Sequence, residues 1–288
     1  MSEKPTIIVT GSNGQLGSEI AEIAAEYPQY GFSFFDRAGL DISNNEKLKT
    51  LFEQLKPAYF INCAAYTAVD KAETEKEKAL TINAEGVGNI ATLCKQYQTK
   101  LIHISTDYVF NGTATGPYKE DDATDPVNYY GYTKLLGENA ALQNNDDTII
   151  IRTSWVYSTY GNNFVKTMMR LMKERPEIKV VSDQIGSPTN AADLAKAILT
   201  IISNTTSGFV PGIYHYSNDG IISWYDFATA IRDIKQYNSI VHPIPSASYP
   251  TPAKRPSYSG MSKEKITATF PIVLRAWRER LVECLSKM

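Results

Sequence analysis

A glycine-rich loop near the start of the chain limits what the first half can fold into. The segment "TIIVTGSNGQLGSEI" joins a short apolar run to a helical pattern and places Gly11, Gly14 and Gly17 three residues apart. Glycines at such a junction allow a tight turn, a close approach of the backbone to a pyrophosphate, and close helix–strand packing. The free N–H groups of the helix then face the anion. The spacing is looser than Gly-x-Gly-x-x-Gly, so a glycine turn without a ligand is the alternative.

Short apolar, β-rich runs alternate with helical patterns up to Ser154. This alternation indicates a doubly wound parallel α/β sheet of the Rossmann type. Apolar runs without polar alternation are typical of strands that are buried on both faces. The expected strands are 6–10, 32–36, 58–65, 100–106 and 148–154, and the expected helices are 15–26, 44–55, 77–97 and 130–143.

An acidic residue follows the second expected strand. Asp36 lies 19 residues beyond Gly17, where a carboxylate accepts hydrogen bonds from the ribose hydroxyls of an adenosine and favours NAD. Arg37 has the opposite implication, because an arginine can hold the additional phosphate of NADP. The sequence therefore predicts NAD or NADP as the cofactor, with NAD favoured.

Two further segments end expected strands at the same edge of the sheet, where ligands of open α/β sheets bind. Asp41 and Ile42 lie in "GLDISN", and Ala64 and Ala65 lie in "NCAAYT". The two alanines leave room for a cofactor beside the backbone, although small residues also serve helix packing. For the first segment the alternative is a helix N-cap, a role that suits Ser43.

The segment "YYGYTK" at 129–134 contains the only Tyr-x-x-x-Lys in the chain. In a helix this spacing places Tyr130 on the same face as Lys134. An ammonium group beside a phenol lowers the pKa of the phenol from about 10, so Tyr130 is a candidate proton donor. Tyr129 and Tyr132 are expected to pack or to form a pocket wall. Such a pair also arises by chance in a chain with this many tyrosines and lysines.

The second half of the chain is less regular and predicts a smaller C-terminal lobe that binds the substrate. Helical patterns occupy 163–174, 191–202 and 270–285, a strand is expected at 178–183, and five prolines within 242–260 predict an irregular loop. We expect residues 1–154 to form the NAD(P)-binding domain and 178–203 to return to it and extend its sheet. Segments 155–177 and 204–288 are expected to form the substrate lobe.

Composition excludes several classes of function. A net charge of −2 gives no electrostatic reason to expect nucleic acid or a membrane as a partner. The three cysteines are widely spaced, which argues against a disulfide framework and suits a reducing compartment. The three histidines lack metal-ligand spacing, so no metal is predicted. No apolar run is long enough for a signal sequence or a membrane span, and we expect a cytoplasmic protein.

The ordered motifs "TGSNGQLG", "NCAAYT", "HISTDYVF", "YGYTK" and "RTSWVY" resemble those of the extended short-chain dehydrogenase/reductases. More narrowly, they are similar to the dTDP-4-dehydrorhamnose reductase family. The resemblance continues through "YGNNFVKTMMRL" and "DQIGSPTNAADLA" to "YPTPAKRP" at 249–256. Its most specific part is the combination of "STDYVF", "RTSWVY" and "GNNF".

The resemblance implies NAD(P)H-dependent reduction of the 4-keto group of dTDP-4-dehydro-L-rhamnose to dTDP-L-rhamnose. It implies that Tyr130 donates the proton, that Lys134 contacts the nicotinamide ribose, and that Thr106 holds the carbonyl. Sugar-nucleotide contacts are implied at Thr106, Asp107, Tyr108, Trp155 and Arg255. Cofactor contacts, with the loop glycines included, are expected at Gly11, Gly14, Gln15, Leu16, Gly17, Asp36, Asp41, Ile42, Ala64, Ala65, Tyr66, Tyr130 and Lys134.

The chain departs from the family pattern at a few positions. Tyr66 stands where many relatives carry histidine, which matters little if only the backbone meets the cofactor. Some relatives bind magnesium at a dimer interface through acidic side chains. Glu19 can match one of these, but Ala192 stands where another is expected, so no metal is predicted. A homodimer is a possible assembly.

Three alternatives stay open. Related nucleotide-sugar 4,6-dehydratases commonly carry Asp-Glu after "ST", whereas here Tyr108 follows Asp107; this weakens dehydration. Epimerisation, or reduction of another nucleotide sugar, is compatible with the motifs. A non-catalytic binding protein similar to the regulatory β subunit of methionine adenosyltransferase is the alternative of a different class. The intact "RTSWVY" motif favours an enzyme.

Overall fold

The computed structural model describes residues 4–204 and 206–288. Its centre is a six-stranded sheet in which all neighbouring strands run parallel. The strands are β1 Thr6–Thr10, β2 Gly31–Phe35, β3 Tyr59–Asn62, β4 Lys100–Thr106, β5 Thr148–Thr153 and β10 Gly212–Tyr216. Their order is β10-β5-β4-β3-β1-β2. The order reverses between β1 and β3, and this switch point is where open α/β sheets bind ligands.

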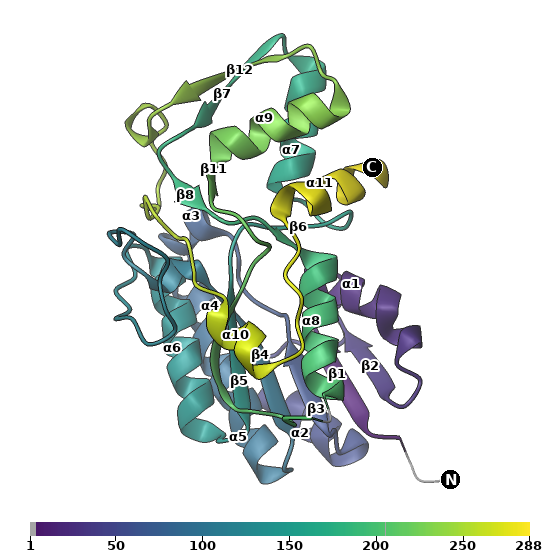
Figure 1. The fold of residues 1–288 in the computed structure, drawn as a ribbon. Coiled ribbons are helices and arrows are strands. Elements are labelled where there is room, and N and C mark those ends of the chain that lie inside the picture. The colour runs from purple at the N-terminus through teal and green to yellow at the C-terminus, as the bar shows by residue number, and fades with distance from the viewer. Residues whose placement is uncertain (1–3, 205) are drawn as a thin grey trace.

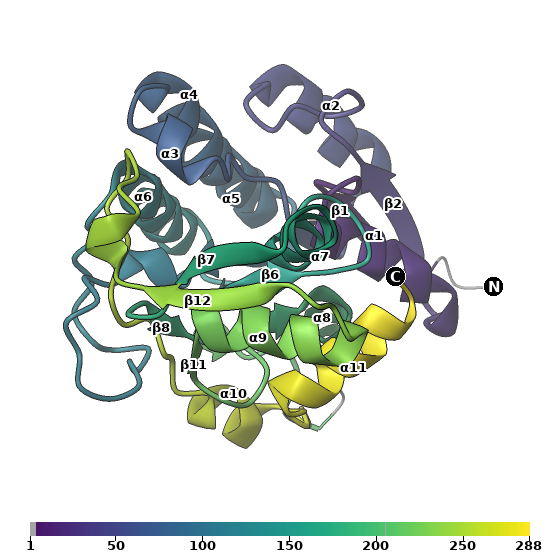
Figure 2. The same cartoon turned by 90° about the horizontal axis from the view of Figure 1, so that it is seen from above.

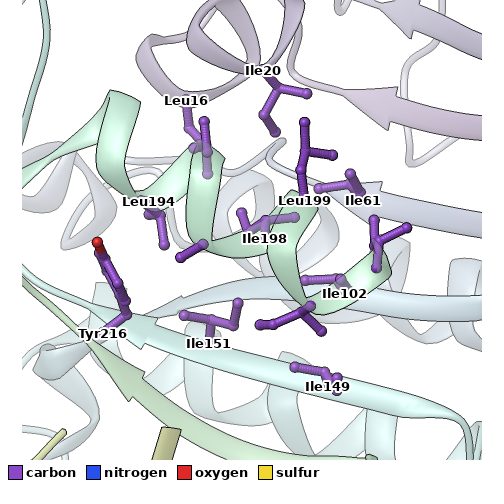
Figure 3. Packing of buried hydrophobic residues seen from close by; sticks show 14 of the residues in the cluster. Leu16, Ile20, Ile61, Ile102, Ile149, Ile151, Leu194, Ile198, Leu199 and Tyr216 are labelled. Atoms are coloured by element: carbon purple, nitrogen blue, oxygen red, sulfur yellow. The ribbon is translucent and has the colours of Figure 1, made fainter. Parts of the chain in front are cut away.

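Helices cover both faces of the sheet, as expected for a doubly wound fold (Figures 1 and 2). The helices are α1 Gln15–Ile23, α2 Asn45–Leu55, α5 Gly86–Gln96, α6 Tyr129–Asn144 and α8 Ala191–Ser203. One face carries α2, α5 and α6, and the other carries α1 and α8. Figure 3 shows apolar side chains of α8, among them Leu194 and Ile198, between α1 and the sheet residues Ile149 and Ile151. The predicted Rossmann-type α/β class is confirmed.

The helix expected at 77–97 is interrupted. It consists of α4 (Lys76–Leu80), a π-helical turn (Thr81–Glu85) and α5, and a short α3 (Val69–Ala72) precedes it. The π turn carries Asn83, whose side chain accepts from the Tyr66 N–H at 2.8 Å and donates to the Tyr66 carbonyl at 3.1 Å. The bulge thus directs a buried amide onto the segment after β3, a use typical of π turns at functional sites.

A small lobe lies above the carboxyl ends of the sheet strands (Figure 1). Its own apolar core is separate from those of the sheet. It comprises α7 Phe164–Glu174, β7 Glu177–Val181, α9 Trp224–Lys235, β12 Ile240–Ile244 and α11 Trp277–Ser286. Short strand pairs connect it to the sheet: β6 Val156–Tyr157 with β9 Thr189–Asn190, and β8 Ile185–Gly186 with β11 Ile222–Ser223. The helix α10, Glu264–Thr269, packs near β10.

The prediction that 178–203 extends the large sheet is wrong for its strand. The strand β7 pairs with β12 in a separate two-stranded sheet, and the sixth strand of the large sheet is β10. β7 alternates between exposed and buried positions, with Glu177 and Lys179 exposed. Such a strand cannot fill a sheet that is buried on both faces. The helix α8 of the same segment does return, and it packs against α1. The division into domains near residue 154 stays a prediction.

Three smaller expectations were wrong. The loop predicted at 242–260 begins with β12, whose Pro243 is tolerated because both strands of a two-stranded sheet are edges. The last helix starts at Trp277 instead of residue 270, since Pro271 interrupts the chain between α10 and α11. The N-cap of α2 is Asn44 rather than Ser43. Among the residues that the structure describes, no helix has the length and apolar character needed to cross a membrane.

A buried ion pair connects α6 to the sheet. Arg152 of β5 donates to both carboxylate oxygens of Glu138 on α6, with Nη2–Oε2 at 2.7 Å and Nε–Oε1 at 3.0 Å. Both residues are buried, and the guanidinium lies over the Phe110 ring at 5.1 Å. Fork geometry of this kind holds two elements in one relative position.

Removing one partner of this pair tests its contribution to stability. We expect Arg152→Met to lower the free energy of unfolding by about 3–5 kcal/mol, because the Glu138 carboxylate stays buried without a counter-charge. Urea unfolding measures the change. The exposed pair Arg170–Glu174 supplies the control, and Arg170→Met should change stability by less than about 1 kcal/mol. Equal losses in both variants would contradict the argument.

Candidate active site

A cavity of about 990 Å³ lies between the carboxyl ends of the sheet strands and the small lobe. Ligand pockets range from about 300 to 1,000 Å³, so this one has room for a large ligand. All the predicted site residues except Gly17 line it. They are Gly11, Gly14, Gln15, Leu16, Asp36, Asp41, Ile42, Ala64, Ala65, Tyr66, Thr106, Asp107, Tyr108, Tyr130, Lys134, Trp155 and Arg255.

The glycine loop has the shape that a pyrophosphate requires. Gly11 has φ +69°, and a Cβ there would lie 2.8 Å from the Ala64 nitrogen. A Cβ at Gly17 would lie 2.4 Å from the Gly11 carbonyl oxygen, so this glycine permits the helix to pack on the loop. No side chain caps the start of α1 at Gly14. The N-terminus of α1 therefore offers backbone N–H groups to the cavity, and the loop fits a dinucleotide.

Asp36 is held at the end of β2 by two donors. Its Oδ2 accepts from Asn13 Nδ2 at 2.7 Å, and its Oδ1 accepts from the Gly39 N–H at 2.8 Å. Arg37 is mostly exposed, and its Nε lies 3.7 Å from the Asp41 carboxylate. The acidic side chain is thus fixed toward the cavity while the arginine is weakly held. Asn13 was not predicted as a site residue.

Tyr130 stands at the start of α6, whose N-cap Asn128 accepts from the Gly131 N–H at 2.8 Å. Its ring meets the Tyr108 ring edge to face, with 5.9 Å between centroids. Burial raises the pKa of Tyr130 to about 12, and the neighbouring Thr106 hydroxyl opposes this rise. The expected lowering by Lys134 is not observed. Neither Tyr129 nor Tyr132 is among the described residues that line the cavity.

The reason lies in the position of the Lys134 ammonium. Lys134 is 1% exposed, and its Nζ donates to the Ile104 carbonyl oxygen at 2.7 Å. The same Nζ lies 3.2 Å from Nε2 of His103. Burial lowers the pKa of Lys134 to about 8, and the Glu138 carboxylate opposes this change. The head of the lysine is therefore engaged by β4 and does not offset the burial of the phenol.

Thr106 and Asp107 form the floor of the cavity beside Tyr130. The Thr106 hydroxyl donates to Asp107 Oδ1 at 2.9 Å and accepts from the Tyr108 N–H at 3.2 Å. Burial raises the pKa of Asp107 to about 6, and the neighbouring Ser259 and Thr106 hydroxyls oppose this rise. These bonds fix the Thr106 oxygen in place.

An aromatic wall faces the cavity from the small lobe. Trp155 stacks on Trp224 with 3.6 Å between ring centroids and 12° between ring planes, and Phe164 packs against Trp224 at 4.5 Å. Trp155 has φ +48°, which is costly for a bulky residue and persists because the stack holds it. Trp224 and Phe164 were not predicted as cavity residues, although Phe164 ends the "GNNF" motif and could have been found from it.

Arg255 reaches the cavity from the loop at 249–256, but its guanidinium already has a partner. Nη1 and Nη2 donate to the two carboxylate oxygens of Asp70 at 3.0 and 2.9 Å. Arg255 thereby lowers the pKa of Asp70. This ion pair connects the loop to α3 and was not predicted.

The structure gives no geometric support to a metal site within residues 4–204 and 206–288, where no group of three or more His, Cys, Asp or Glu side chains could hold an ion. Glu19, the predicted match to a magnesium ligand, is buried and accepts from the Ser158 hydroxyl. The absence of a metal stays a prediction.

Fold and cavity together define a dinucleotide-binding protein with a second, smaller lobe over the cavity. The family model described as RmlD substrate binding domain matches residues 5–288. The dTDP-4-dehydrorhamnose reductase of Aggregatibacter actinomycetemcomitans is 40% identical over 283 residues, which cover 96% of each chain. The spore coat polysaccharide biosynthesis protein SpsK of Bacillus subtilis is 41% identical over 283 residues, covering 98% of this chain and 97% of SpsK.

A solved structure is similarly close. The crystal structure of dTDP-4-dehydrorhamnose reductase from Bacillus anthracis, in complex with NADP, matches with a TM-score of 0.94 at 39% identity, covering 99% of this chain and 100% of that one. The chain belongs to the dTDP-4-dehydrorhamnose reductase family of NAD(P)-dependent oxidoreductases. The resemblance predicted from the motifs is confirmed.

The approach of α6 to the segment after β4 can be tested at Gly131. A Cβ at this position would lie 2.1 Å from the Tyr108 carbonyl oxygen. We expect Gly131→Ala to lower the free energy of unfolding by about 1–3 kcal/mol despite the higher helix propensity of alanine. Thermal and urea unfolding measure it. Gly116→Ala is the control because no atom lies within 4 Å of its added Cβ. A Gly131→Ala protein as stable as the parent would show that α6 can move.

Proposed function

We propose that this protein catalyses NAD(P)H-dependent reduction of the 4-keto group of dTDP-4-dehydro-L-rhamnose to dTDP-L-rhamnose. The observation that carries the proposal is the position of Tyr130 and Thr106. Both lie in one cavity between the glycine loop on one side and the aromatic wall of the small lobe on the other. A carbonyl between these two halves is within reach of a phenol and a hydroxyl. The names of relatives about 40% identical over nearly the whole chain support this substrate.

The glycine loop, the uncapped start of α1 and Asp36 would hold the dinucleotide. When bound, the reduced nicotinamide supplies the hydride that converts the carbonyl carbon to a carbinol. Asp36 would accept from the adenosine ribose hydroxyls, and Lys134 would hydrogen-bond the nicotinamide ribose. The glycine at position 11 lets the loop pack against the backbone of Cys63 and Ala64, where a Cβ would lie 2.8 Å from the Ala64 nitrogen.

Tyr130 supplies the proton. Its raised pKa means that the phenol carries its hydrogen throughout the neutral range, which is the form a reductase needs in an acid. Thr106 would turn its one hydroxyl hydrogen from Asp107 Oδ1 to the carbonyl oxygen of the substrate and keep that oxygen beside the phenol. The oxygen would gain negative charge as the carbonyl is reduced, and hydrogen bonds from Tyr130 and Thr106 would stabilise that charge.

The rest of the cavity would bind the sugar nucleotide. Trp155 offers a flat apolar surface, and Tyr108 and Asp107 offer polar groups near the catalytic pair. Arg255 keeps further N–H groups beyond those given to Asp70, and arginine suits the oxygens of a diphosphate. These substrate contacts rest on position in the cavity and on the family pattern.

The proposed cofactor is NAD or NADP. The NADP complex of the Bacillus anthracis relative supports use of the phosphorylated form. The fixed Asp36 carboxylate supports NAD, and the exposed Arg37 is available to a 2′-phosphate. We propose a protein that accepts both, without a membrane or nucleic-acid partner and with a homodimer as its possible assembly. We also propose that it acts in the cytoplasm.

The reaction is tested by following the absorbance of the reduced nicotinamide. Purified protein is mixed with NADH or NADPH and enzymatically generated dTDP-4-dehydro-L-rhamnose. Oxidation equal to the amount of keto sugar, with dTDP-L-rhamnose as product, is expected. An epimerase would turn over without net oxidation. Cofactor binding without any oxidation would favour a reductase of another nucleotide sugar or a non-catalytic subunit.

Tyr130→Phe removes the proposed acid. Turnover should fall by about 100-fold or more, while the free energy of unfolding stays close to that of the parent. Steady-state kinetics and urea unfolding measure the two quantities. Tyr132→Phe is the matched control, because Tyr132 is 46% exposed and does not line the cavity. A Tyr130→Phe enzyme with normal turnover would refute the role of Tyr130 as the proton donor.

Asp36→Ala removes the carboxylate proposed to meet the adenosine ribose. It should raise the KM for NADH more than that for NADPH, since the 2′-phosphate replaces the hydroxyl that Asp36 would bind. The comparison requires both cofactors at saturating keto sugar. Asp146→Ala, on the surface near Lys95, serves as a control with no expected effect. Equal changes for the two cofactors would mean that Asp36 only orders the loop around Gly39.

A further inference from the structure

An ion pair beside the cavity holds a side chain that the proposed function assigns to the substrate. Asp70 of α3 accepts three hydrogen bonds from the loop at 249–256: from Arg255 Nη1 at 3.0 Å, from Arg255 Nη2 at 2.9 Å and from the Ala253 N–H at 3.2 Å. Arg255 lines the cavity, whereas Asp70 is not among the described residues that do. The carboxylate therefore contacts the guanidinium without occupying the space offered to a ligand.

The backbone of the same loop is fixed to the sheet half of the protein. The Lys254 carbonyl oxygen accepts from Asn128 Nδ2 at 2.8 Å, and Asn128 is also the N-cap of α6. The Ser257 hydroxyl, just after the loop, donates to the Gly112 carbonyl oxygen at 2.9 Å. Because the backbone is held on both sides of Arg255, the direction of its guanidinium depends on the contacts of the side chain itself.

The contacts of Arg255 leave one edge of the guanidinium available. Its Nη1 donates to Asp70 and, at 3.1 Å, to the Ala253 carbonyl oxygen, and its Nη2 gives one hydrogen to Asp70. An arginine has five N–H donors, so the Nε hydrogen and one Nη2 hydrogen have no acceptor in the part of the chain that the structure describes. These two lie along one edge, the edge with which Arg152 binds both oxygens of Glu138. A fork of this shape matches two oxygens of a phosphate.

The other cations of the cavity come from the sheet half and have partners there. The described cationic side chains that line the cavity are Arg37, Lys78, Lys134 and Arg255. The first three contact, in that order, the Asp41 carboxylate, the Glu75 carboxylate and the Ile104 carbonyl oxygen. Burial raises the pKa of the Tyr108 phenol, and the Arg255 guanidinium opposes this rise. Arg255 is thus the described cavity cation with an unused N–H edge on the side of Tyr108 and Tyr130.

We propose that Asp70 is a positioning residue that holds the Arg255 guanidinium with its Nε–Nη2 edge toward the diphosphate of the sugar nucleotide. This inference deepens the proposed function, because it concerns how the same cavity recognises its substrate. Arg255 donates to Asp70 and thereby lowers the pKa of this carboxyl group, which stays ionised at neutral pH. The ion pair orders a flexible side chain in advance, so that substrate binding does not have to order it at a cost in affinity. Asp70 stays bound to Arg255 in the complex.

Binding of dTDP to the purified protein tests the inference without any turnover. Asp70→Asn keeps the shape of the side chain but removes its charge and one of its two acceptor oxygens. Its Kd for dTDP, measured by isothermal titration calorimetry, should lie about 3- to 10-fold above that of the parent, because Arg255 is no longer ordered in advance. An unchanged Kd would overturn the proposal. So would a lower Kd, since it would mean that the carboxylate competes with the diphosphate for the guanidinium.

The effect of Asp70 should depend on Arg255. Arg255→Ala should raise the Kd for dTDP by about 30-fold or more, and Asp70→Asn added to it should cause no further rise. An equal rise in both backgrounds would mean that Asp70 acts on the loop rather than on the guanidinium, and it would refute the proposal. The matched control is Asp233→Asn, because the pair Asp233–Arg232 is similarly exposed and is not among the described residues that line the cavity. This control should leave the Kd for dTDP unchanged.

Two further readouts separate positioning from a general structural role. The Kd of Asp70→Asn for NADPH should stay within about 2-fold of that of the parent, as expected for an independent site. A parallel loss of NADPH binding would mean that α3 has shifted, and it would overturn the inference. In keto sugar reduction the KM should rise together with the Kd for dTDP, while kcat stays within about 3-fold, because the lost interaction is one of uniform binding. A fall in kcat at an unchanged KM would refute the role.

The same measurements distinguish this inference from the proposed function. If the protein does not reduce the keto sugar but dTDP binding follows the expected pattern, the proposed reaction fails and the role of Asp70 stands. If the protein reduces the keto sugar and Asp70→Asn binds dTDP as tightly as the parent does, only the present inference fails.

Discussion

The close packing of α6 on its neighbours is the constraint on which the rest of the site depends. At Gly131 and Gly137 the helix meets the carbonyl oxygens of Tyr108 and Asn83, and any Cβ would lie 2.1 and 2.0 Å from those atoms. The Arg152–Glu138 pair then fixes the same helix against β5. Backbone contacts this close prevent α6 from shifting. The side chains of its first two turns therefore have one position relative to Thr106 and Asp107 on the floor of the cavity.

With α6 in that position, residues of the sheet and of the small lobe line one cavity. The glycine loop and the strand ends come from the sheet, whose geometry follows from parallel pairing alone. The aromatic wall comes from the small lobe, where Trp155 accepts an unfavourable φ of +48° and is held by Trp224. Strained backbone at a bulky residue persists only where its surroundings determine it. The stacked tryptophans therefore give the cavity lined by Tyr130 a fixed aromatic surface.

Sequence patterns predicted the sheet half well, because buried parallel strands and a glycine loop leave local signals. The strands at 6–10 and 100–106 were predicted to the residue. The small lobe was predicted poorly. Its strand pairing, β7 with β12, joins segments about sixty residues apart, and no local pattern specifies such a pairing. The same is true of the cavity. The cavity residues that were predicted belong to recognisable motifs. Trp224, Asn13 and Asp70, the partner of Arg255, were not predicted, because their positions in the site depend on contacts with residues far away in the sequence.

The pKa values in the site depend on burial as well as on neighbours in the sequence. Tyr130 and Lys134 are four residues apart on α6 and have the sequence pattern of an acid beside a cation. On an exposed helix the cation would lower the pKa of the phenol. Burial reverses the result. It raises the pKa values of Tyr130 and Asp107 and lowers that of Lys134, so each group moves toward its neutral form. The shifts differ in their consequence at neutral pH: the Tyr130 phenol keeps its proton, whereas a pKa of about 6 leaves Asp107 mostly a carboxylate and a pKa of about 8 leaves Lys134 mostly an ammonium. Desolvation, more than the neighbouring cation, thus sets the pKa of Tyr130 in this cavity.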